Sequence, residues 1–249
     1  MRKYCGILML FRYSGNKGRL LKFYRTPPAN CRRIVEPYVG SGAYSINNDL
    51  PAIGFDINLD IVEMWHWLQH VTPENLSHLS DIVEKSKTIE KQDVRDLNLA
   101  KGPQTYVRIN VCSVVVGQLS SWKIYPQHKL PIKKTIKCLD RIKNIEIFLK
   151  DANDYEHQDG DLLFIDPPYT GTSANYMEGG QRGIERNYHP KQTINLIEST
   201  NNPIIFTYGT AAPEIFPMYD WNVVETRRVA NIRRGGTIER TEYVSYINW

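Results

Sequence analysis

Apolar positions along this chain follow two patterns, short continuous runs and longer stretches with helical spacing. The runs "RRIVEPYV" (32–39), "PAIGFDI" (51–57), "DLLFID" (161–166) and "NPIIFTYG" (202–209) are bounded by polar or turn residues. Runs of this kind are typical of strands that are buried on both faces. The sequence therefore predicts strands over 32–39, in 51–57 as far as Asp56, over 161–166 and within 202–209.

Between these runs the apolar spacing changes to that of helices. Apolar residues recur every three or four positions within 58–71, which predicts a helix there. Thr72 then offers a capping side chain, Pro73 suits a first helical turn, and Glu74 lies near the positive end of the helix dipole. These residues predict a second helix that runs to about Lys87. A further helix is expected within 190–199.

The remaining segments complete the predicted architecture. Residues 221–229 and 241–249 alternate like two strands around a Gly235–Gly236 turn, and 135–148 reads as a helix followed by a strand. Strands that alternate with helices predict an α/β sheet, mainly parallel, with a late antiparallel hairpin. The rest of 88–145 has no regular pattern and could form a separate small domain.

Composition limits the class of protein. The 249 residues are 41% hydrophobic, which is enough for a sizeable core, and no apolar stretch reaches the roughly 18 residues of a membrane span. The early patch "CGILMLF" is short for a signal peptide, so a cytoplasmic protein is expected. The cysteines, Cys5, Cys31, Cys112 and Cys138, are widely spaced, which favours reduced thiols over a zinc site or a disulfide framework.

Charge is distributed unevenly along the chain. Residues 1–33 carry nine Lys or Arg and no acid, and 123–150 carry eight basic and two acidic residues. Residues 46–96 instead carry ten acidic and four basic residues. This asymmetry fits a protein that presents one positive side to a polyanion, although ordinary solvated surface is the alternative.

Two of the predicted strands end in residues suited to ligand binding. The first is followed by "GSG", where Gly40 and Gly42 let the backbone approach a ligand, and the second ends at Asp56, an acid placed to bind ribose hydroxyls. A phosphate-cradling GxxxxGK[ST] motif and the third glycine of a dinucleotide fingerprint are both missing. The pattern favours an adenosine-bearing ligand without a pyrophosphate.

A third strand ends in Asp166-Pro167-Pro168-Tyr169. Prolines fix the direction of the chain and donate no backbone hydrogen bond, so this segment is predicted to be a rigid elbow with free carbonyl oxygens. A carboxylate, a fixed carbonyl and an aromatic ring suit a planar base that carries an exocyclic amine. The alternative is a loop that merely begins with prolines, with Asp166 as a helix cap.

At this point the chain resembles a known family, the Dam-type DNA adenine-N6 methyltransferases. The resemblance rests on "RYSGNKGRLL" (12–21), "VEPYVGSGAYSIN" (35–47), "GFDIN" (54–58), "FIDPPYTGTSANY" (164–176) and "RRVANIRRGGTIERTEYVSYIN" (227–248). It implies a Rossmann-like methyltransferase fold, S-adenosylmethionine as cofactor, and DNA with a flipped-out adenine as substrate. It further implies a core of residues 1–64 and 146–249, with 65–145 as an inserted helical target-recognition region.

The resemblance also implies roles for individual residues. Glu36 and the 40–42 turn would lie near the methionine part of the cofactor, Asp56 would hold its ribose, and Asp151 would lie near its adenine. Asp166 would contact both cofactor and target amine, and Tyr169 would stack on the target base. The implied cofactor contacts are Tyr13, Lys17, Glu36, Gly40, Ser41, Gly42, Asp56, Asp151 and Asp166, and the implied catalytic residues are Asp166, Pro167, Pro168 and Tyr169.

The middle of the chain departs from the family, because no Gly- and Asn-rich reading hairpin aligns there. Basic and aromatic residues could still grip DNA, and no metal ligand set is expected. An N4-cytosine or RNA adenine methyltransferase, or an inactive nucleic-acid-binding relative, stays open, as does the role in restriction-modification, regulation or viral genome protection. The candidate DNA-binding residues are Trp122, Lys123, Lys133, Lys134, Arg233 and Arg234.

Overall fold

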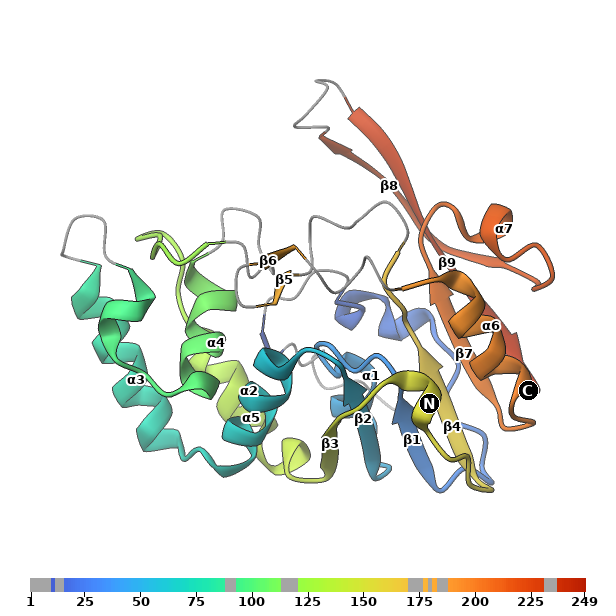
Figure 1. Cartoon of the computed structure of the whole chain (residues 1–249), viewed down its shortest axis with the longest axis horizontal. Helices are drawn as coiled ribbons and strands as arrows, with labels where there is room; N and C mark the ends of the chain where they lie inside the picture. The colour runs from blue at the N-terminus through green and yellow to red at the C-terminus, as the bar shows by residue number, and fades with distance from the viewer. Residues whose placement is uncertain are drawn as a thin grey trace.

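The computed structural model describes residues 10–11, 16–87, 93–112, 121–169, 177–178, 181–182, 188–230 and 237–249. A seven-stranded sheet crosses this part of the molecule, and β5 (Met177–Glu178) and β6 (Gln181–Arg182) form a separate antiparallel pair (Figure 1). The large sheet consists of β1 (Arg33–Glu36), β2 (Ala52–Asp56), β3 (Ile145–Leu149), β4 (Asp161–Ile165), β7 (Ile204–Tyr208), β8 (Asn222–Ala230) and β9 (Thr237–Ile247).

The order of the strands explains where a ligand can bind. The sheet runs β3-β2-β1-β4-β7-β9-β8; the first five strands are parallel, and β9 is antiparallel to both of its neighbours. This mixed sheet confirms the prediction of a mainly parallel α/β fold with a late antiparallel hairpin. The chain reverses its direction of travel across the sheet between β1 and β4, and such switch points open a crevice at the carboxyl ends of the strands.

Helices cover both faces of the sheet. Neighbouring residues of β4 belong to different hydrophobic clusters: Phe164 to the one that contains Trp65 of α2, and Ile165 to the one that contains Leu196 of α6. Burial on both faces is why these strands appear in the sequence as unbroken apolar runs. The helices are α1 (Ala43–Ile46), α2 (Leu59–His70), α3 (Pro73–Ser86), α4 (Lys101–Val111), α5 (Ile132–Ile142), α6 (Pro190–Glu198) and α7 (Ala212–Ile215), with 3-10 turns η1 (Gly18–Phe23), η2 (Val94–Leu97) and η3 (Ala152–Asp154).

Capping residues set the helix boundaries as the sequence predicts. The Thr72 side chain accepts a hydrogen bond from the Asn75 N–H at 3.2 Å, and Pro73 opens α3. The helix ends at Ser86, one residue before the predicted end. The elements α4, η2 and α7 were not predicted. Helix α4 begins with Lys-Gly-Pro, and glycine and proline weaken the helical signal there.

Four described helices between β2 and β3, α2 to α5, lie beside the β3 edge of the sheet (Figure 1). Helix α2 packs on both β3 and α4, and apolar residues of α2 to α5 share one hydrophobic cluster with residues of β1 and β4. A boundary at residue 65 would fall in the middle of α2. The division of the chain into a core and an inserted target-recognition region stays a prediction.

The structure bears on two expectations about the whole chain, those for membrane spans and for the cysteines. Across the described ranges, no helix combines the length and the apolar character needed to cross a bilayer. Cys31, Cys112 and Cys138 are buried and free, as expected for reduced thiols.

Candidate functional site

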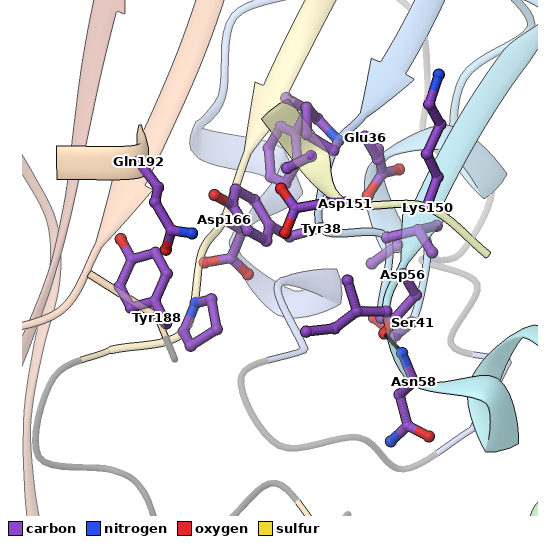
Figure 2. A pocket seen from close by; sticks show the side chains of 18 of the residues that line it. Glu36, Tyr38, Ser41, Asp56, Asn58, Lys150, Asp151, Asp166, Tyr188 and Gln192 are labelled. Carbon is purple, nitrogen blue, oxygen red and sulfur yellow. Dashed lines mark hydrogen bonds between the residues drawn. The ribbon is translucent and has the colours of Figure 1, made fainter. Parts of the chain in front are cut away.

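A pocket opens where β1, β2 and β4 end, at the switch point of the sheet. Its lining comes from segments that lie far apart in the sequence, including the start of η1, the turn after β1, the end of β2 and the loop after β4. Figure 2 shows the lining as two ends of one pocket, with Asp166, Tyr188 and Gln192 at one end and Ser41, Asp56 and Asn58 at the other.

The glycine turn after β1 is fixed from behind by a tryptophan. Gly40 and Gly42 adopt positive φ values of 42° and 56°. The Trp65 indole N–H donates to the Gly40 carbonyl at 3.0 Å, and a Cβ on Gly42 would lie 2.7 Å from Trp65 Cζ2. Gly40 and Ser41 line the pocket, while Gly42 packs against Trp65. The turn therefore needs glycine both for its backbone angles and for this close approach.

Glu36, the last residue of β1, places a buried carboxylate in the pocket wall. Its Oε1 accepts a hydrogen bond from the Ser45 N–H at 2.7 Å, and only 2% of the residue is exposed. Burial raises the pKa of Glu36 to about 7, and the nearby Asp166 carboxylate adds to this effect against the hydrogen bonds from Ser45. Glu36 can therefore change its charge close to neutral pH.

Asp56 ends β2 and is held by the turn that starts the next helix. Its Oδ1 accepts a hydrogen bond from the Asn58 N–H at 2.8 Å, and Asn58 in turn caps α2 by accepting from the Asp60 N–H at 2.9 Å. Both Asp56 and Asn58 line the pocket. A short local turn is thus enough to point this acid toward a ligand.

Asp151 is held in a similar way. Its Oδ1 accepts hydrogen bonds from the backbone and side-chain nitrogens of Asn153, at 2.9 and 2.8 Å, where it caps η3. The structure places Asp151 in the pocket lining together with the neighbouring Lys150. The chain therefore brings Asp151 to the same pocket as Asp56, although the two lie 95 residues apart in sequence.

The Asp166 end of the pocket is the most connected part of the site. Lys17, which is 3% exposed, places its Nζ 2.9 Å from Asp166 Oδ2 and 2.8 Å from Oδ1. The Thr207 hydroxyl donates to Oδ1 at 2.9 Å. Pro168 lines the pocket beside this carboxylate, while Pro167 is buried. The elbow after β4 is therefore anchored by η1 and β7, two elements remote in the sequence.

Tyr169 lies beside this carboxylate rather than in open solvent. Its hydroxyl is 3.2 Å from Asp166 Oδ1 and 2.9 Å from Glu242 Oε2, and the Lys17 amine lies 4.8 Å from its ring centroid. Burial, and then the charges of Asp166 and Glu242, raise the pKa of Tyr169 well above its ordinary value. The hydroxyl is therefore a hydrogen-bond donor at any physiological pH.

A small hydroxyl cluster also borders the Asp166 end of the pocket. Tyr38 and Tyr188 both place their hydroxyls on Thr193 Oγ1, at 3.3 and 2.9 Å. Gln192 completes the capping box of α6, since its Oε1 accepts from the His189 N–H at 2.8 Å. This contact fixes the amide of Gln192 at the mouth of the pocket.

The candidate DNA-binding residues that the structure describes do not line the pocket. Trp122 is partly buried, with the Arg108 guanidinium 3.6 Å and that of Arg95 5.4 Å from its ring centroid. Lys123 is exposed, and Lys133 and Lys134 are exposed in the first turn of α5. Two further candidates, Arg233 and Arg234, and the cofactor candidate Tyr13 lie outside the described residues.

Several residues of the site escaped the sequence reasoning. Thr207 follows an apolar run near the end of a strand, so the same strand-end rule that selected Asp56 could have found it. Glu242 sits in the middle of an alternating strand and has no local signal. Tyr188 and Gln192 come from the start of α6, and their presence at the pocket follows only from the packing of α6 on the sheet.

Comparisons with known proteins add little to this geometry. No protein-family model matches this chain. A solved structure with a distantly similar chain course is the tRNA m1G37 methyltransferase of M. jannaschii, with 13% identity and a TM-score of 0.40. The match covers 98% of this chain and 56% of that one, so this chain spans little more than half of that protein. Within the described ranges, no group of three or more His, Cys, Asp or Glu is arranged to hold a metal ion.

Proposed function

We propose that this protein is an S-adenosylmethionine-dependent methyltransferase that methylates the exocyclic N6 amine of a flipped-out adenine in DNA. One observation carries the proposal: Asp166 and its proline elbow share a pocket with the glycine turn and with Asp56. An amine-binding elbow and an adenosine-binding wall in one pocket are what methyl transfer between those two groups requires. The chemistry rests on positioning the reactants, which alone can supply several kcal/mol, roughly 7–11 in favourable cases.

The charges of the pocket fit the cofactor. Among the described lining residues, carboxylates outnumber amines: Glu36, Asp56, Asp151 and Asp166 against Lys17 and Lys150. Lys17 is already paired with Asp166. An acidic pocket suits a ligand with a sulfonium and an ammonium group, and it disfavours the pyrophosphate of a nicotinamide or flavin dinucleotide.

Individual residues have matching roles in holding the cofactor. Asp56 offers carboxylate oxygen to the ribose diol, as acids at the end of a second strand do in nucleotide-binding sheets. Glu36 suits the ammonium of the methionine part, because pairing with a cation stabilises its ionised form. Asp151, which also lines the pocket, suits the amine of the adenine ring. The backbone turn at Gly40 allows close approach.

Asp166 is the residue that acts on the target amine. The adenine N6 lone pair is delocalised into the ring, so the amine is a weak nucleophile. Hydrogen bonds from the amine to the Asp166 carboxylate and the Pro167 carbonyl draw the nitrogen toward tetrahedral geometry and release the lone pair. Bound S-adenosylmethionine would supply the electrophilic methyl group, so that an N–CH3 bond forms as the S–CH3 bond breaks, S-adenosylhomocysteine leaves, and the methylated nitrogen loses one proton to solvent. Lys17 and Thr207 fix the Asp166 carboxylate, so its orientation is set before the substrate arrives.

Access to the amine requires the base to leave the duplex, at a cost of a few kcal/mol. Stacking on Tyr169 returns about 1–3 kcal/mol, and phosphate contacts must supply the rest. The β8–β9 hairpin projects beyond the sheet (Figure 1), and it carries the exposed Arg227 and Arg240 directly opposite each other. Like charges in a cross-strand pair destabilise a hairpin, and an anionic partner relieves that cost. This pair supports DNA as the partner.

The test is product analysis. The purified protein is incubated with S-adenosylmethionine labelled on the methyl group and with unmethylated DNA, then with RNA, and the nucleosides are separated by mass spectrometry. Labelled N6-methyladenine from DNA supports the proposal. Label in N4-methylcytosine or only in RNA overturns the substrate, and absence of label with intact cofactor binding overturns the enzyme. A reaction without protein provides the blank, and Asp166→Asn should transfer the label far more slowly than wild type.

A further inference from the structure

Glu242 stands out because a charged residue of the antiparallel hairpin reaches into the site of the parallel sheet. Its side chain is 16% exposed, and its Oε2 lies 2.9 Å from the Tyr169 hydroxyl and 3.8 Å from Lys17 Nζ. It comes from β9, which pairs with β7, the strand beside β4. A carboxylate is costly to hold so far from water unless its partners need it.

The Tyr169 hydroxyl has two possible acceptors. It lies 2.9 Å from Glu242 and 3.2 Å from Asp166. A phenol carries one proton, so it donates fully to one acceptor at a time, and the shorter distance favours Glu242. This choice matters because Asp166 already accepts from Lys17 and from Thr207. A carboxylate has about four lone-pair positions. A third protein donor would compete with the substrate amine.

The Tyr169 ring is held by packing as well as by the hydrogen bond of its hydroxyl. A Cβ on Gly209 would lie 2.7 Å from Tyr169 Cδ2, so the ring rests on bare backbone. Tyr208 packs on it with the ring centroids 4.6 Å apart. Packing fixes the position of the ring, and the bond to Glu242 fixes the direction of the hydroxyl.

We propose that Glu242 is a positioning residue: it draws the Tyr169 hydroxyl away from Asp166, so that Asp166 keeps an acceptor position for the target amine. The inference rests on the proposed function. It assigns Glu242 no contact with substrate or cofactor; the residue acts through Tyr169.

The experiment is a double-mutant cycle. Steady-state methyl transfer to DNA is measured for wild type, Glu242→Leu, Glu242→Gln and Tyr169→Phe, and for Glu242→Leu in the Tyr169→Phe background. We expect Glu242→Leu to lower kcat about tenfold, the size of one competing hydrogen bond to a charged group. The cofactor Kd should change by less than about twofold, because Glu242 does not line the pocket.

Two comparisons separate positioning from a structural role. Glu242→Gln keeps an oxygen acceptor, so its kcat should stay within about threefold of wild type. With Tyr169→Phe the competing hydroxyl is gone, so adding Glu242→Leu should cost almost nothing further. Glu63→Gln, which changes an exposed acid of α2 that does not line the pocket, is the control and should behave as wild type. Thermal unfolding of each variant shows whether it folds.

Each outcome decides a different point. If Glu242→Leu equals wild type, or loses the same factor with and without the Tyr169 hydroxyl, the positioning role is wrong while the proposed function stands. If Glu242→Leu does not fold, the positioning role is tested with Glu242→Gln, alone and combined with Tyr169→Phe. A tenfold loss of kcat in Glu242→Gln would contradict the role of Glu242 as a hydrogen-bond acceptor. If wild type transfers no methyl group to any nucleic acid, the proposed function fails and takes this inference with it.

Discussion

Asp56 and Asp166 stand at the ends of the two strands that flank β1, yet they are held in opposite ways. Asp56 is oriented by Asn58, two residues further along the chain. Asp166 is oriented by Lys17 and Thr207, which are 149 and 41 residues away in sequence. A local turn contributes to holding the Asp56 carboxylate, whereas the Asp166 carboxylate is held by contacts from Lys17, just before η1, and from β7.

The difference separates two tasks within one pocket. A ribose-binding acid needs only to point outward from the end of a strand, and a two-residue turn achieves this. An acid that must align a reacting amine needs its orientation fixed to within a fraction of an ångström, and a long-range network provides that restraint. We therefore expect substitutions at the Asp166 end to affect turnover most, and substitutions at the Asp56 end to affect cofactor affinity most.

The largest effect is expected from Asp166→Asn. The change removes a charged acceptor from the reacting centre, so kcat should fall roughly 10²–10³-fold, as when one preorganised hydrogen-bonding group is removed from other active sites. Lys17 would also lose its nearest anion, so the melting temperature should fall. Methyl transfer to DNA and thermal unfolding measure the two effects.

Asp154→Asn is a suitable control, because Asp154 is an exposed acid in η3 that does not line the pocket. If the kcat of Asp166→Asn were close to that of this control, Asp166 would not act on the target amine. The proposed division of roles between Asp166 and Asp56 would then be wrong.

The raised pKa of Glu36 predicts that stability depends on pH. Glu36 ends β1, the strand between β2 and β4. Its pKa is about 7 in the folded protein and is close to its ordinary 4.5 when unfolded. Between these values the folded state holds one more proton, so the free energy of unfolding should fall as pH rises from about 4.5 to 7, by about 3 kcal/mol at most. Denaturation of wild type and Glu36→Gln across this range measures it.

The substituted protein should lack this slope. An identical pH dependence in both proteins would show that Glu36 does not titrate there. The Asp166 charge contributes to the raised pKa of Glu36, so Asp166→Asn should shift the upper end of the window to lower pH.

Asp56→Asn should act on the cofactor rather than on turnover. Losing a charged hydrogen-bond acceptor to a ribose hydroxyl costs about 2 kcal/mol, which weakens the cofactor Kd roughly 30-fold. Saturating cofactor should restore most of kcat. Isothermal calorimetry with S-adenosylmethionine measures the affinity, and unchanged affinity together with weaker DNA binding would place the cofactor elsewhere.

The smallest effect is expected from the hairpin. Replacing Arg227 and Arg240 with Ala should weaken DNA binding several-fold for all sequences and reduce the salt slope by about 0.9 for each phosphate that is no longer neutralised. It should also stabilise the hairpin slightly, by about 0.2–1 kcal/mol, because two like charges no longer oppose each other. Titrations at two salt concentrations measure the first effect.

Lys143→Ala is the matched control, since Lys143 is an exposed lysine next to the amino end of β3, at the sheet edge opposite the pocket. Equal effects from Lys143→Ala and the Arg227 and Arg240 pair would remove the hairpin from the DNA surface.

The same contrast explains what the sequence could predict. Local rules placed the ends of β2 and α3 to within a residue or two, because Asp56 and Thr72 act on residues two or three positions away. The strand-end rule selected Gly40, Asp56 and Asp166, which the structure brings to one pocket. It could not show that Lys17 contacts Asp166; the family resemblance implied that Lys17 contacts the cofactor. Nor could it show that Glu242 lies beside Tyr169. Those contacts depend on how distant elements pack.

The insertion of β9 between β7 and β8 has a consequence for synthesis on the ribosome. A growing chain that has emerged only as far as β8 contains Lys17, Asp166 and Tyr169 but lacks Glu242. The edge of β7 is then an open row of unpaired backbone groups, which readily pair with another chain. The nascent protein is therefore prone to aggregate until residues 237–247 arrive. The strand that brings Glu242 to the site is also the one that protects this edge, so the site and the sheet are completed in the same step.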